Sequence, residues 1–567
     1  MAGRGRSPVN RRIRLLLALL LGGFAVLLGR AAWLQAVQAG SLSQLAAKQH
    51  RESVVLPASR GTIFDRTGVQ LAIGEQATTV YADPRQVRDA RVVAVAAART
   101  LGVNANTLYE HLSNRKTSFV YVKRKADPAR AALLEKRHLA GLGFYPEERR
   151  FYPQGSVASH VLGYAGLDNR GLAGLELQLD KTLAGLPGGE TRVVDALGHV
   201  LDVVDPRPAV DGRDVRLTID HTIQANAEAV LRQTISKWAA KGATAVVLDP
   251  RTGEVLAMAD APGFDANTFG SVPPAVTRNR AVTDVYEPGS TFKLVTVAGV
   301  LSDRLVTPQT EFTLPYSIHV ADRVIHDAEL RGTETMSVAR ILAQSSNVGA
   351  ITLAEKLGPT RLYHWMRRLG FGAKTGVGFP GESPGFVLKP VDWSGSTIGN
   401  VPIGQGVAVT PVQMAAAYAT IANHGVWVRP HVVERIQGAT RVQPVKRRVL
   451  RRAVAAELNA MLQNVVREGT GTLAAVPGYK VAGKTGTAQK PDAHGGYSSG
   501  RYVASFVGMV PASRPRLVVL VTVDEPRGAI WGGVVAAPAF AQIAAYDLQY
   551  LEVPPDAPSV VPQSGTN

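Results

Sequence analysis

Hydrophobic and polar positions divide the chain into three kinds of segment. Leu15–Val37 is an apolar run whose only charge is Arg30. From about residue 40 to 220, short apolar stretches alternate with turn-forming residues: Arg91–Leu101 has the apolar spacing of a helix, and Ser118–Val122 has the pattern of a strand. The second segment is therefore predicted to be a mixed α/β module. No short catalytic motif is found in it, which favours a structural or docking role.

The third segment predicts a sheet built from both of its ends. Ala243–Leu248 and Glu254–Met258 are apolar runs around a turn, and Ser505–Val510 and Leu517–Val523 form a second such pair. Mostly helical patterns lie between these pairs, and an apolar helix is expected from about Val534 to Leu551. Strands from both ends with helices between them predict an α/β fold of the α+β kind, with one antiparallel sheet covered by helices.

The N-terminal apolar run is predicted to be a membrane anchor. Leu15–Val37 reaches the ~20 residues that a bilayer helix needs, and Arg30 lies near its far end, where a long side chain can reach the headgroups. Five arginines and no acid precede Leu15, which places the N-terminus in the cytoplasm and the bulk of the chain outside it. The alternative is a signal peptide cleaved near Val37-Gln38-Ala39.

These patterns give a predicted domain order. Residues after Val553 are rich in Pro and Ser and are expected to be disordered. The expected parts are a cytoplasmic tail (1–14), a single transmembrane anchor in the inner membrane (15–37), a pedestal module (38–220), a catalytic domain (221–552) and a disordered tail (553–567).

Composition narrows the functional classes. The 567 residues suit two or three folded units. The 63 basic and 45 acidic residues leave a net charge of +18, which suits an anionic envelope polymer or membrane surface better than nucleic acid, since no zinc-ligand spacing or RNA-binding aromatic signature occurs. No cysteine is present, so a thiol nucleophile is excluded. The twelve histidines have no metal-binding spacing, so neither a metal nor a cofactor is expected.

The first chemical motif is Ser290-Thr291-Phe292-Lys293. A Pro-Gly pair precedes it and the apolar run Leu294–Leu301 follows, which predicts a helix start with Ser290 in the first turn. Lys293 lies three residues further on, about one turn along the same face. A serine becomes a good nucleophile when a base takes its proton, and lysine can be that base if burial and neighbouring cations lower its pKa.

Two further motifs follow in order. Ser345-Ser346-Asn347 offers a hydroxyl and an amide to the rim of a site. Lys484-Thr485-Gly486-Thr487 stands beside the strand-like Tyr479–Val481. Lys484 supplies a positive charge, Thr485 and Thr487 supply donors for a carboxylate, and Gly486 would let a substrate backbone approach closely.

Each motif alone is a weak signal, because the chain contains a second copy of two of them. Ser113-Asn114-Arg115-Lys116 also fits S-x-x-K, but it precedes a strand. Lys374-Thr375-Gly376 also fits K-T-G, but it lies in a stretch rich in Gly and Pro, where a lysine is usually solvated. The ordered triple, with each member in a suitable local setting, is the specific signal.

The triple of S-x-x-K, S-x-N and K-T-G resembles that of the penicilloyl-serine transferases, and specifically the monofunctional class B penicillin-binding proteins. The resemblance extends over nearly the whole chain. Ser346 stands where β-lactamases carry Asp, as in penicillin-binding proteins. Gly29–Gln35 together with Ser345-Ser346-Asn347 is similar to the division-specific branch. The other segments that carry the resemblance are Arg60–Arg66, Gly171–Glu176, Tyr286–Lys293, Gly404–Pro411 and Lys484–Ala488.

The resemblance implies a peptidoglycan D,D-transpeptidase that cross-links stem peptides in septal wall synthesis. Ser290 would attack the carbonyl between the last two D-alanines while Lys293 takes its proton. Backbone N–H groups of Ser290 and Thr487 would form the oxyanion hole. Ser345 and Lys484 would pass a proton to the departing D-alanine. β-Lactams would acylate the same serine.

The resemblance also implies partners for the remaining parts. Thr485 and Thr487 would hold the carboxylate of the D-Ala-D-Ala stem peptide, and Asn347 would line the site. The pedestal module would dock on an FtsW-type lipid-II polymerase and other division proteins. The membrane is expected to be a partner, and nucleic acid is not.

Several other functions share parts of this pattern. A D,D-carboxypeptidase and an elongation-type class B transpeptidase have similar motifs. A β-lactamase would not need an anchor and a module of roughly 180 residues in front, and it usually adds a carboxylate base for deacylation. A membrane β-lactam sensor should carry signalling sequence in the cytoplasm, where only about fourteen residues are expected. A structural scaffold would not need the triple, and no credible paired-carboxylate motif in residues 40–220 indicates a glycosyltransferase.

Overall fold

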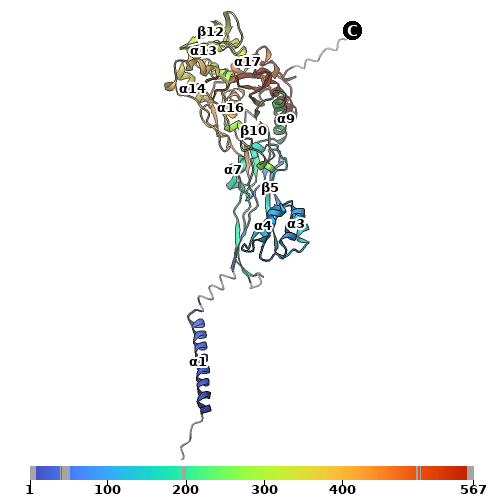
Figure 1. The fold of residues 1–567 in the computed structure, drawn as a ribbon. Coiled ribbons are helices and arrows are strands. Elements are labelled where there is room, and N and C mark those ends of the chain that lie inside the picture. The colour runs from blue at the N-terminus through green and yellow to red at the C-terminus, as the bar shows by residue number, and fades with distance from the viewer. Residues whose placement is uncertain are drawn as a thin grey trace, which may run out of the picture. The chain divides into compact units, whose positions relative to one another are not determined.

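The computed structural model describes residues 8–38, 40, 51–194, 200–492, 496–497 and 500–557. Two compact units make up the chain. The first contains residues 1–58 and 185–211, and the second contains residues 59–184 and 212–567. Figure 1 shows the elements of both units.

The first unit holds the apolar helix and a small sheet. Helix α1 (Pro8–Ala36) contains a stretch, Arg11–Ala36, that is long and apolar enough to cross a membrane, with a mean hydropathy of 2.2. None of that apolar window is buried against the rest of the protein. Three antiparallel strands follow in the order β1-β6-β7: β1 (Arg51–Leu56), β6 (Gly188–Val194) and β7 (Val200–Arg207).

The second unit begins with an α/β module, as the sequence predicts. Its long strand β3 pairs with β2, β4 and β5, and β8 continues the sheet to β16, which comes from much later in the chain. Helices α3 and α4 pack side by side on a core that includes Val80, Val93 and Leu112 (Figure 1). The elements are β2 (Ile63–Phe64), β3 (Gln70–Ala82), α3 (Ala90–Leu101), α4 (Ala105–Ser113), β4 (Val120–Ala126), α5 (Pro128–Glu135), β5 (Leu142–Phe151), α6 (Ser159–Leu162), α7 (Gly174–Gln178), α8 (Asp180–Leu183), β8 (Val215–Leu217) and β16 (Val433–Ile436).

A buried ion network joins two of the segments on which the resemblance rests. The Arg60 guanidinium donates to Glu176 at 2.7 Å and to Asp180 at 2.7 Å, and Arg150 donates to the other oxygen of Glu176 at 2.6 Å. The Glu176 side chain is fully buried. Removing Glu176 would leave the buried Arg150 guanidinium without its carboxylate partner, at a cost of about 3–5 kcal/mol. The ion network therefore holds these two segments of the module together.

The remainder of the second unit is built on a five-stranded antiparallel sheet in the order β10-β9-β20-β19-β18. Both faces are buried, because alternate residues enter different cores: Ala245 and Val247 pack with α9 and α19, whereas Val246 and Leu248 pack with the core of α11 and α16. The predicted antiparallel sheet covered by helices is confirmed. Its strands are β9 (Gly242–Leu248), β10 (Val255–Ala261), β18 (Ala482–Gln489), β19 (Tyr502–Val510) and β20 (Leu517–Asp524).

Helices and short hairpins surround this sheet. They are α9 (His221–Lys237), η1 (Ala266–Ser271), α10 (Arg280–Thr283), η2 (Gly289–Phe292), α11 (Lys293–Ser302), β11 (Glu311–Leu314), β12 (Ser317–Val320), β13 (Arg323–His326), β14 (Glu334–Ser337), α12 (Val338–Ala343), α13 (Asn347–Leu357), α14 (Pro359–Leu369), η3 (Pro390–Asp392), α15 (Thr397–Asn400), η4 (Val401–Ile403), α16 (Pro411–Ala422), β15 (Val426–Val428), β17 (Lys446–Arg448), α17 (Arg452–Arg467), η5 (Thr472–Ala474), α18 (Gly532–Val535) and α19 (Ala537–Tyr550). The expected C-terminal helix is interrupted at Ala536, so α19 starts afresh with a proline in its first turn, where the missing N–H has no cost.

Two expectations near the C-terminus are wrong in their bounds. Tyr479–Val481 is not a strand, because its polar groups bind the chain end instead of a sheet ladder: the Tyr479 hydroxyl donates to the Val553 carbonyl, and the Lys480 N–H donates to Asp556 at 2.7 Å. Residues 553–557 are therefore held in place rather than forming the start of a disordered tail. The rest of the predicted tail, 558–567, lies outside the described residues, as do residues 1–7 of the predicted cytoplasmic tail.

Candidate active site

Ser290 lies in a tight turn rather than in an α-helix. It belongs to the 3₁₀ turn η2, and α11 begins only at Lys293. The buried Tyr418 of α16 donates from its hydroxyl to the Thr291 carbonyl at 2.9 Å, and this hydrogen bond holds the turn against α16. Ser290 is partly exposed, whereas its neighbours Gly289 and Thr291 are buried. The side chain of Ser290 makes no hydrogen bond within the described part of the chain, so it is presented to incoming reagents.

Two glycines allow strand β18 to approach this turn closely. A Cβ on Gly486 would lie 2.8 Å from the Pro288 carbonyl oxygen and 2.3 Å from the Ser505 hydroxyl oxygen. A Cβ on Gly289, whose φ is +54°, would lie 2.9 Å from the Thr487 carbonyl oxygen. Such contacts are closer than van der Waals packing allows. Gly486 is therefore required by the packing of β18 against the serine turn.

Lys293 connects the first motif to the second. Its ammonium group donates to the Asn347 side-chain oxygen at 2.8 Å and to the Ser345 hydroxyl at 3.2 Å, and it also donates to the Ser345 carbonyl. Ser345 has a left-handed backbone with φ of +60°, which is uncommon for a non-glycine residue and turns its carbonyl and hydroxyl towards the same lysine. The structure thus brings Lys293, Ser345 and Asn347 together.

Burial changes the protonation of Lys293. The side chain is 1% exposed, and the loss of solvation lowers its pKa to about 7, although the carboxylate of Asp327 acts in the opposite direction. A lysine with this pKa is neutral in a substantial fraction of molecules near pH 7. It can therefore accept a proton from a hydroxyl, which an ordinary surface lysine cannot do at that pH.

The third motif lies on the edge strand of the sheet. Lys484 is fully buried, and its pKa is well below the ordinary value because of burial and because of the positive charge of Lys293. Its ammonium group donates to the Thr485 hydroxyl at 3.2 Å. The Thr485 hydroxyl is also 2.7 Å from that of Thr470. The first and third motifs meet where β18 packs against the serine turn, through the close approach at Gly486 and Gly289.

Thr487 lies two residues after Thr485, on the same face of β18. Its hydroxyl oxygen accepts a hydrogen bond from the Gly532 N–H at 3.0 Å, and the residue is half-buried. Because its oxygen accepts from Gly532, the hydroxyl proton of Thr487 can be directed elsewhere. Lys484, Thr485 and Thr487 together present an amine and two hydroxyl groups on one strand, and these hydrogen-bond donors suit a carboxylate.

Asp327 is a residue of the site that the sequence reading did not identify. It follows β13, and its carboxylate accepts from the Ser346 hydroxyl at 3.0 Å, from the Asn347 N–H at 2.5 Å and from the Val348 N–H at 3.0 Å. The carboxylate thereby caps α13 and holds the S-x-N turn against the β12–β13 hairpin. No local pattern marks Asp327, although the apolar alternation that precedes it could have indicated the hairpin.

The two motif copies lie in different surroundings. Ser113 is the last residue of α4, and its hydroxyl donates to the Tyr109 carbonyl of the same helix at 2.8 Å. Lys374 is exposed in a loop, and Thr375 and Gly376 donate to the carboxylate of Glu382. The hydrogen bonds of Ser113 thus stay within α4, and those of Thr375 and Gly376 stay within their own loop.

One group of potential metal ligands occurs among the described residues. Ligand atoms of Asp65, Asp220 and His221 lie within 4.8 Å of one another. The oxygens of Asp65 already accept from His221 Nδ1 at 2.7 Å, from Thr67 and from the Val69 N–H. These hydrogen bonds satisfy the buried carboxylate of Asp65, which holds the turn at residues 65–69 together. The group is separate from Ser290 and takes no part in the site described above.

Two family models match the chain. The penicillin-binding protein transpeptidase domain matches residues 243–545, and the penicillin-binding protein dimerisation domain matches residues 55–217. The first match contains all three motifs, and the second contains both segments of the buried ion network.

Named relatives extend over almost the whole chain. The peptidoglycan D,D-transpeptidase FtsI of Escherichia coli is 33% identical and the stage V sporulation protein D of Bacillus subtilis is 35% identical; each alignment covers 97% of this chain, and 93% and 87% of the respective relatives. Among solved structures, penicillin-binding protein 3 of Mycobacterium tuberculosis in complex with aztreonam has a TM-score of 0.70 and 33% identity, covering 89% of this chain and 99% of that one. The chain belongs to the penicillin-binding proteins, in the class B group that combines a dimerisation domain with a transpeptidase domain.

Proposed function

We propose that the chain is a serine-type peptidoglycan D,D-transpeptidase that cross-links stem peptides and that reacts with β-lactams. The observation that carries the proposal is the buried Lys293, which links the serine turn to Ser345 and Asn347 and whose pKa is about 7. The motifs of a serine acyl-transferase are thereby joined by a group that can act as a base at physiological pH. The relatives named as D,D-transpeptidases support the same activity.

The proposed reaction has two acyl transfers. Ser290 Oγ attacks the carbonyl carbon between the last two D-alanines, and its proton passes to neutral Lys293. The N–H groups of Ser290 and Thr487 are the proposed oxyanion donors, each contributing about 3–4 kcal/mol by analogy with other acyl transfers. The C–N bond then breaks, and the departing D-alanine leaves as an amine after receiving a proton through Ser345 and Lys484.

The second transfer releases the enzyme. An amine from a neighbouring stem peptide attacks the ester at Ser290 and loses a proton to the lysine side of the site. The C–O bond of the ester then breaks, Ser290 Oγ takes back a proton, and the new amide is released. Thr485 and Thr487 are proposed to hold the carboxylate of the terminal D-alanine before it leaves, with Lys484 providing positive charge. Gly486 is proposed to let the backbone of the substrate approach β18 closely. No metal or cofactor enters these steps.

Labelling with a fluorescent penicillin tests the nucleophile. We expect Ser290→Ala to lose the covalent adduct completely, because the change removes only the hydroxyl that forms the ester. Ser113→Ala is the matched control, since it removes a hydroxyl from the other S-x-x-K sequence and should leave labelling unchanged. An adduct mapped to any residue other than Ser290 would contradict the proposal.

The acceptor distinguishes a transpeptidase from a D,D-carboxypeptidase. With a D-Ala-D-Ala peptide and a high concentration of a D-amino acid as acceptor, a transpeptidase gives mostly the exchanged peptide, whereas a carboxypeptidase gives mostly the hydrolysed peptide. We expect exchange to dominate. Predominant hydrolysis at saturating acceptor would favour the carboxypeptidase.

A septal role is the finer part of the proposal. The FtsI relative supports cell division, but the sporulation relative has a similar identity, so depletion of the protein in its own cells is the required test. Filamentous cells would support division, and rounded cells would support the elongation-type alternative. The proposed division partners, including an FtsW-type polymerase, would bind residues 38–220; loss of co-purification when this segment is replaced would be the supporting result.

Helix α1 is proposed to anchor the protein in the inner membrane with its N-terminus in the cytoplasm. The apolar stretch Arg11–Ala36 and the arginines before Leu15 support this orientation. The proposed parts remain residues 1–14, 15–37, 38–220 and 221–552. The intact mass of the protein purified from membranes decides between anchor and signal peptide: a mature chain that begins near Gly40 would overturn the anchor.

A further inference from the structure

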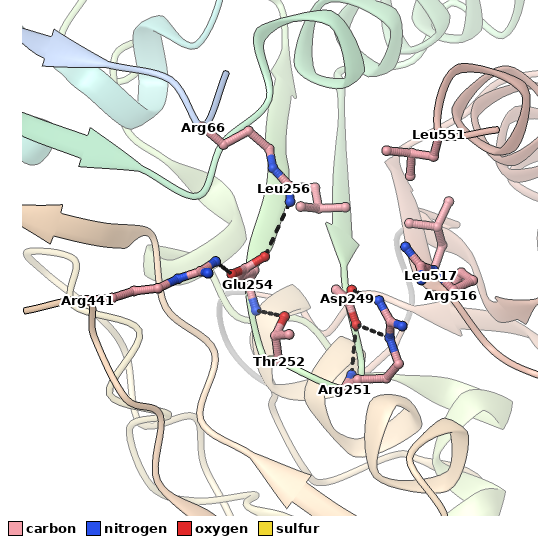
Figure 2. A pocket seen from close by; sticks show the side chains of 10 residues that line it. All are labelled: Arg66, Asp249, Arg251, Thr252, Glu254, Leu256, Arg441, Arg516, Leu517 and Leu551. Carbon is pink, nitrogen blue, oxygen red and sulfur yellow. Dashed lines mark hydrogen bonds and ion pairs between the residues drawn. The ribbon is translucent and has the colours of Figure 1, made fainter. Parts of the chain in front are cut away.

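A second charged pocket lies at the end of the catalytic sheet opposite to the site of Ser290. Figure 2 shows it between the β9–β10 turn, the residues that precede β20, and Arg66 from the dimerisation segment. Its volume is about 240 Å³. Ala482 is in register with the strand ends at the pocket, through Met509, Val518 and Leu248. Thr487 is therefore about 17 Å away along the strands and about 14 Å across three strand spacings.

The pocket has more positive than negative charge. Four arginines line it, namely Arg66, Arg251, Arg441 and Arg516, and only two carboxylates, Asp249 and Glu254, do so. These six side chains leave a net charge of +2. Glu254 is 2.5 Å from Arg441 and 3.6 Å from Arg66, and Asp249 binds Arg251 through two hydrogen bonds of 3.1 and 2.7 Å (Figure 2).

Arg516 is the arginine without a carboxylate. Its Nε is buried and has no hydrogen-bond partner, and no ion pair of its guanidinium occurs within the described part of the chain. Burial lowers the pKa of Arg516, and the positive charges of Arg251, Arg514 and Arg66 lower it further, whereas Asp249 offsets this in part. A buried donor without a partner destabilises the protein by about 1–3 kcal/mol, and more when it is charged.

We propose that this pocket binds a small phosphate-type oxyanion, with Arg516 as its principal ligand and Arg251 as its neighbour. A guanidinium fork matches two phosphate oxygens, so a phosphate would supply the acceptor that Arg516 Nε lacks. A phosphate monoester carries a charge of about −1.5 to −2 near pH 7, which balances the excess of +2, whereas a single carboxylate would balance half of it. The volume is below the ~300–1,000 Å³ of drug-sized pockets, which favours a small ligand.

The ligand would join parts of the chain that are distant in sequence. Arg66 belongs to the segment matched by the dimerisation domain, whereas Arg251 and Arg516 belong to the segment matched by the transpeptidase domain. Binding would thus stabilise the contact of these segments within the second unit. The phosphate could be a free ion or the headgroup of a phosphate ester, and both use the same guanidinium chemistry.

Calorimetry on the full-length protein in an uncharged detergent tests the site. Sodium phosphate is titrated at constant ionic strength, and the melting temperature is recorded in parallel. We expect saturable binding and a saturable rise in melting temperature. A short-chain phosphatidic acid below its micelle concentration is the second ligand: tighter binding than phosphate would assign the site to an ester headgroup, and weaker binding would assign it to the free ion.

Two arginine variants separate a site from a general positive field. Arg516→Ala should weaken binding by about ten- to a hundredfold, the usual effect of a charge-assisted hydrogen bond. Arg514→Ala removes the same charge from an exposed neighbouring position and should change affinity less than about twofold. Equal losses in both variants, or no saturable binding in the unchanged protein, would overturn the proposal.

A folding control keeps the test decisive. Arg516→Ala should still react with penicillin at the rate of the unchanged protein, because the pocket is remote from Ser290. If that variant does not fold, Arg516→Lys replaces it, since lysine keeps the charge but lacks the fork and should show an intermediate loss of affinity. Undiminished binding by Arg516→Lys would contradict the role of the guanidinium as principal ligand.

Discussion

The two Lys-Thr-Gly sequences of this chain have the same residues and different surroundings. Lys484 is fully buried on β18, whereas Lys374 is exposed in a loop. In the loop, Thr375 donates through its N–H and its hydroxyl to the carboxylate of Glu382, at 2.5 and 2.6 Å. On β18, the Thr485 hydroxyl instead meets the hydroxyl of Thr470. The donors of the motif in the loop are thus already bound to a carboxylate of the same chain, that of Glu382.

This difference shows what the triplet contributes by itself. A Thr-Gly pair offers backbone N–H groups and a threonine hydroxyl, and these donors can bind a carboxylate both in the loop and on β18. On β18 the neighbouring lysines are desolvated and the edge strand is open to an incoming chain, so the same donors can serve an external ligand. In the loop, Glu382 is only six or seven residues away and saturates the donors. The tertiary position of the triplet therefore decides whether it can serve as a binding site.

The largest of these expected effects comes from removing Lys484, with the removal of Lys374 as the comparison. Lys484→Ala should lower the second-order rate of penicillin acylation by about 10²–10³-fold, the usual loss for one preorganised electrostatic group. Lys374→Ala should leave that rate within about twofold, because an exposed lysine contributes little. Stopped-flow acylation with one penicillin measures both. A larger loss for Lys374→Ala would reverse the assignment of the two sequences.

The buried lysines also predict a pH profile that an exposed lysine would not produce. Lys293 acts as a base only when neutral, and its pKa is about 7. The acylation rate should therefore rise with pH through 7 and level off above it, and it should fall roughly fiftyfold between pH 7 and pH 5. Rates measured over pH 5–9 at constant ionic strength check this. A flat profile over pH 5–7 would mean that Lys293 is not the base.

Asp327 is a carboxylate that acts on the buried Lys293 but forms no hydrogen bond with either Lys-Thr-Gly sequence. Its charge raises the pKa of Lys293, so Asp327→Asn should move the inflection of the pH profile to lower pH. The variant should also lose about tenfold in acylation above the inflection, since Asn347 loses its anchor. A lower rate without any shift of the inflection would indicate a purely structural role.

The smallest expected effect on catalysis concerns Glu382. Glu382→Ala leaves the N–H groups of Thr375 and Gly376 without their acceptor and should lower the free energy of unfolding by about 1–3 kcal/mol. Acylation should remain unchanged. Denaturant unfolding and the penicillin rate, measured on the same sample, separate the two effects. A strong loss of acylation in a folded variant would show that the loop and the site are coupled.

The fold was largely predictable because its signals are local. The strands at both ends of the catalytic domain are apolar runs separated by turns. Their pairing into one sheet is expected because sheets and helices pack as layers around a shared hydrophobic core. The helix at Val534 was predicted as a single element because its apolar pattern continues across Ala536, where the interruption depends on tertiary packing. Tyr479–Val481 was misread as a strand because the partners of its polar groups, near Asp556, are more than seventy residues away.

The site was predictable only as far as its short motifs extend. Lys293 was identified from its spacing to Ser290, but its hydrogen bonds go to Ser345 and Asn347, which lie more than fifty residues away in the sequence. Asp327 and Thr470 carry no motif. Both residues come close to the site only through the tertiary fold. No local pattern in a single sequence indicates that position.

The small sheet of the first unit imposes an order of events during synthesis. Among the described residues, strand β1 (Arg51–Leu56) pairs with β6 alone, and the last residue of β6 is Val194. After Leu56 has been made, the ribosome must add 194 − 56 = 138 residues before the partner strand is complete. At 5–20 residues per second this interval lasts roughly 7–28 s. During that time β1 has no partner in its sheet, so a holding chaperone or early contact with the export machinery would protect it from pairing with other nascent chains.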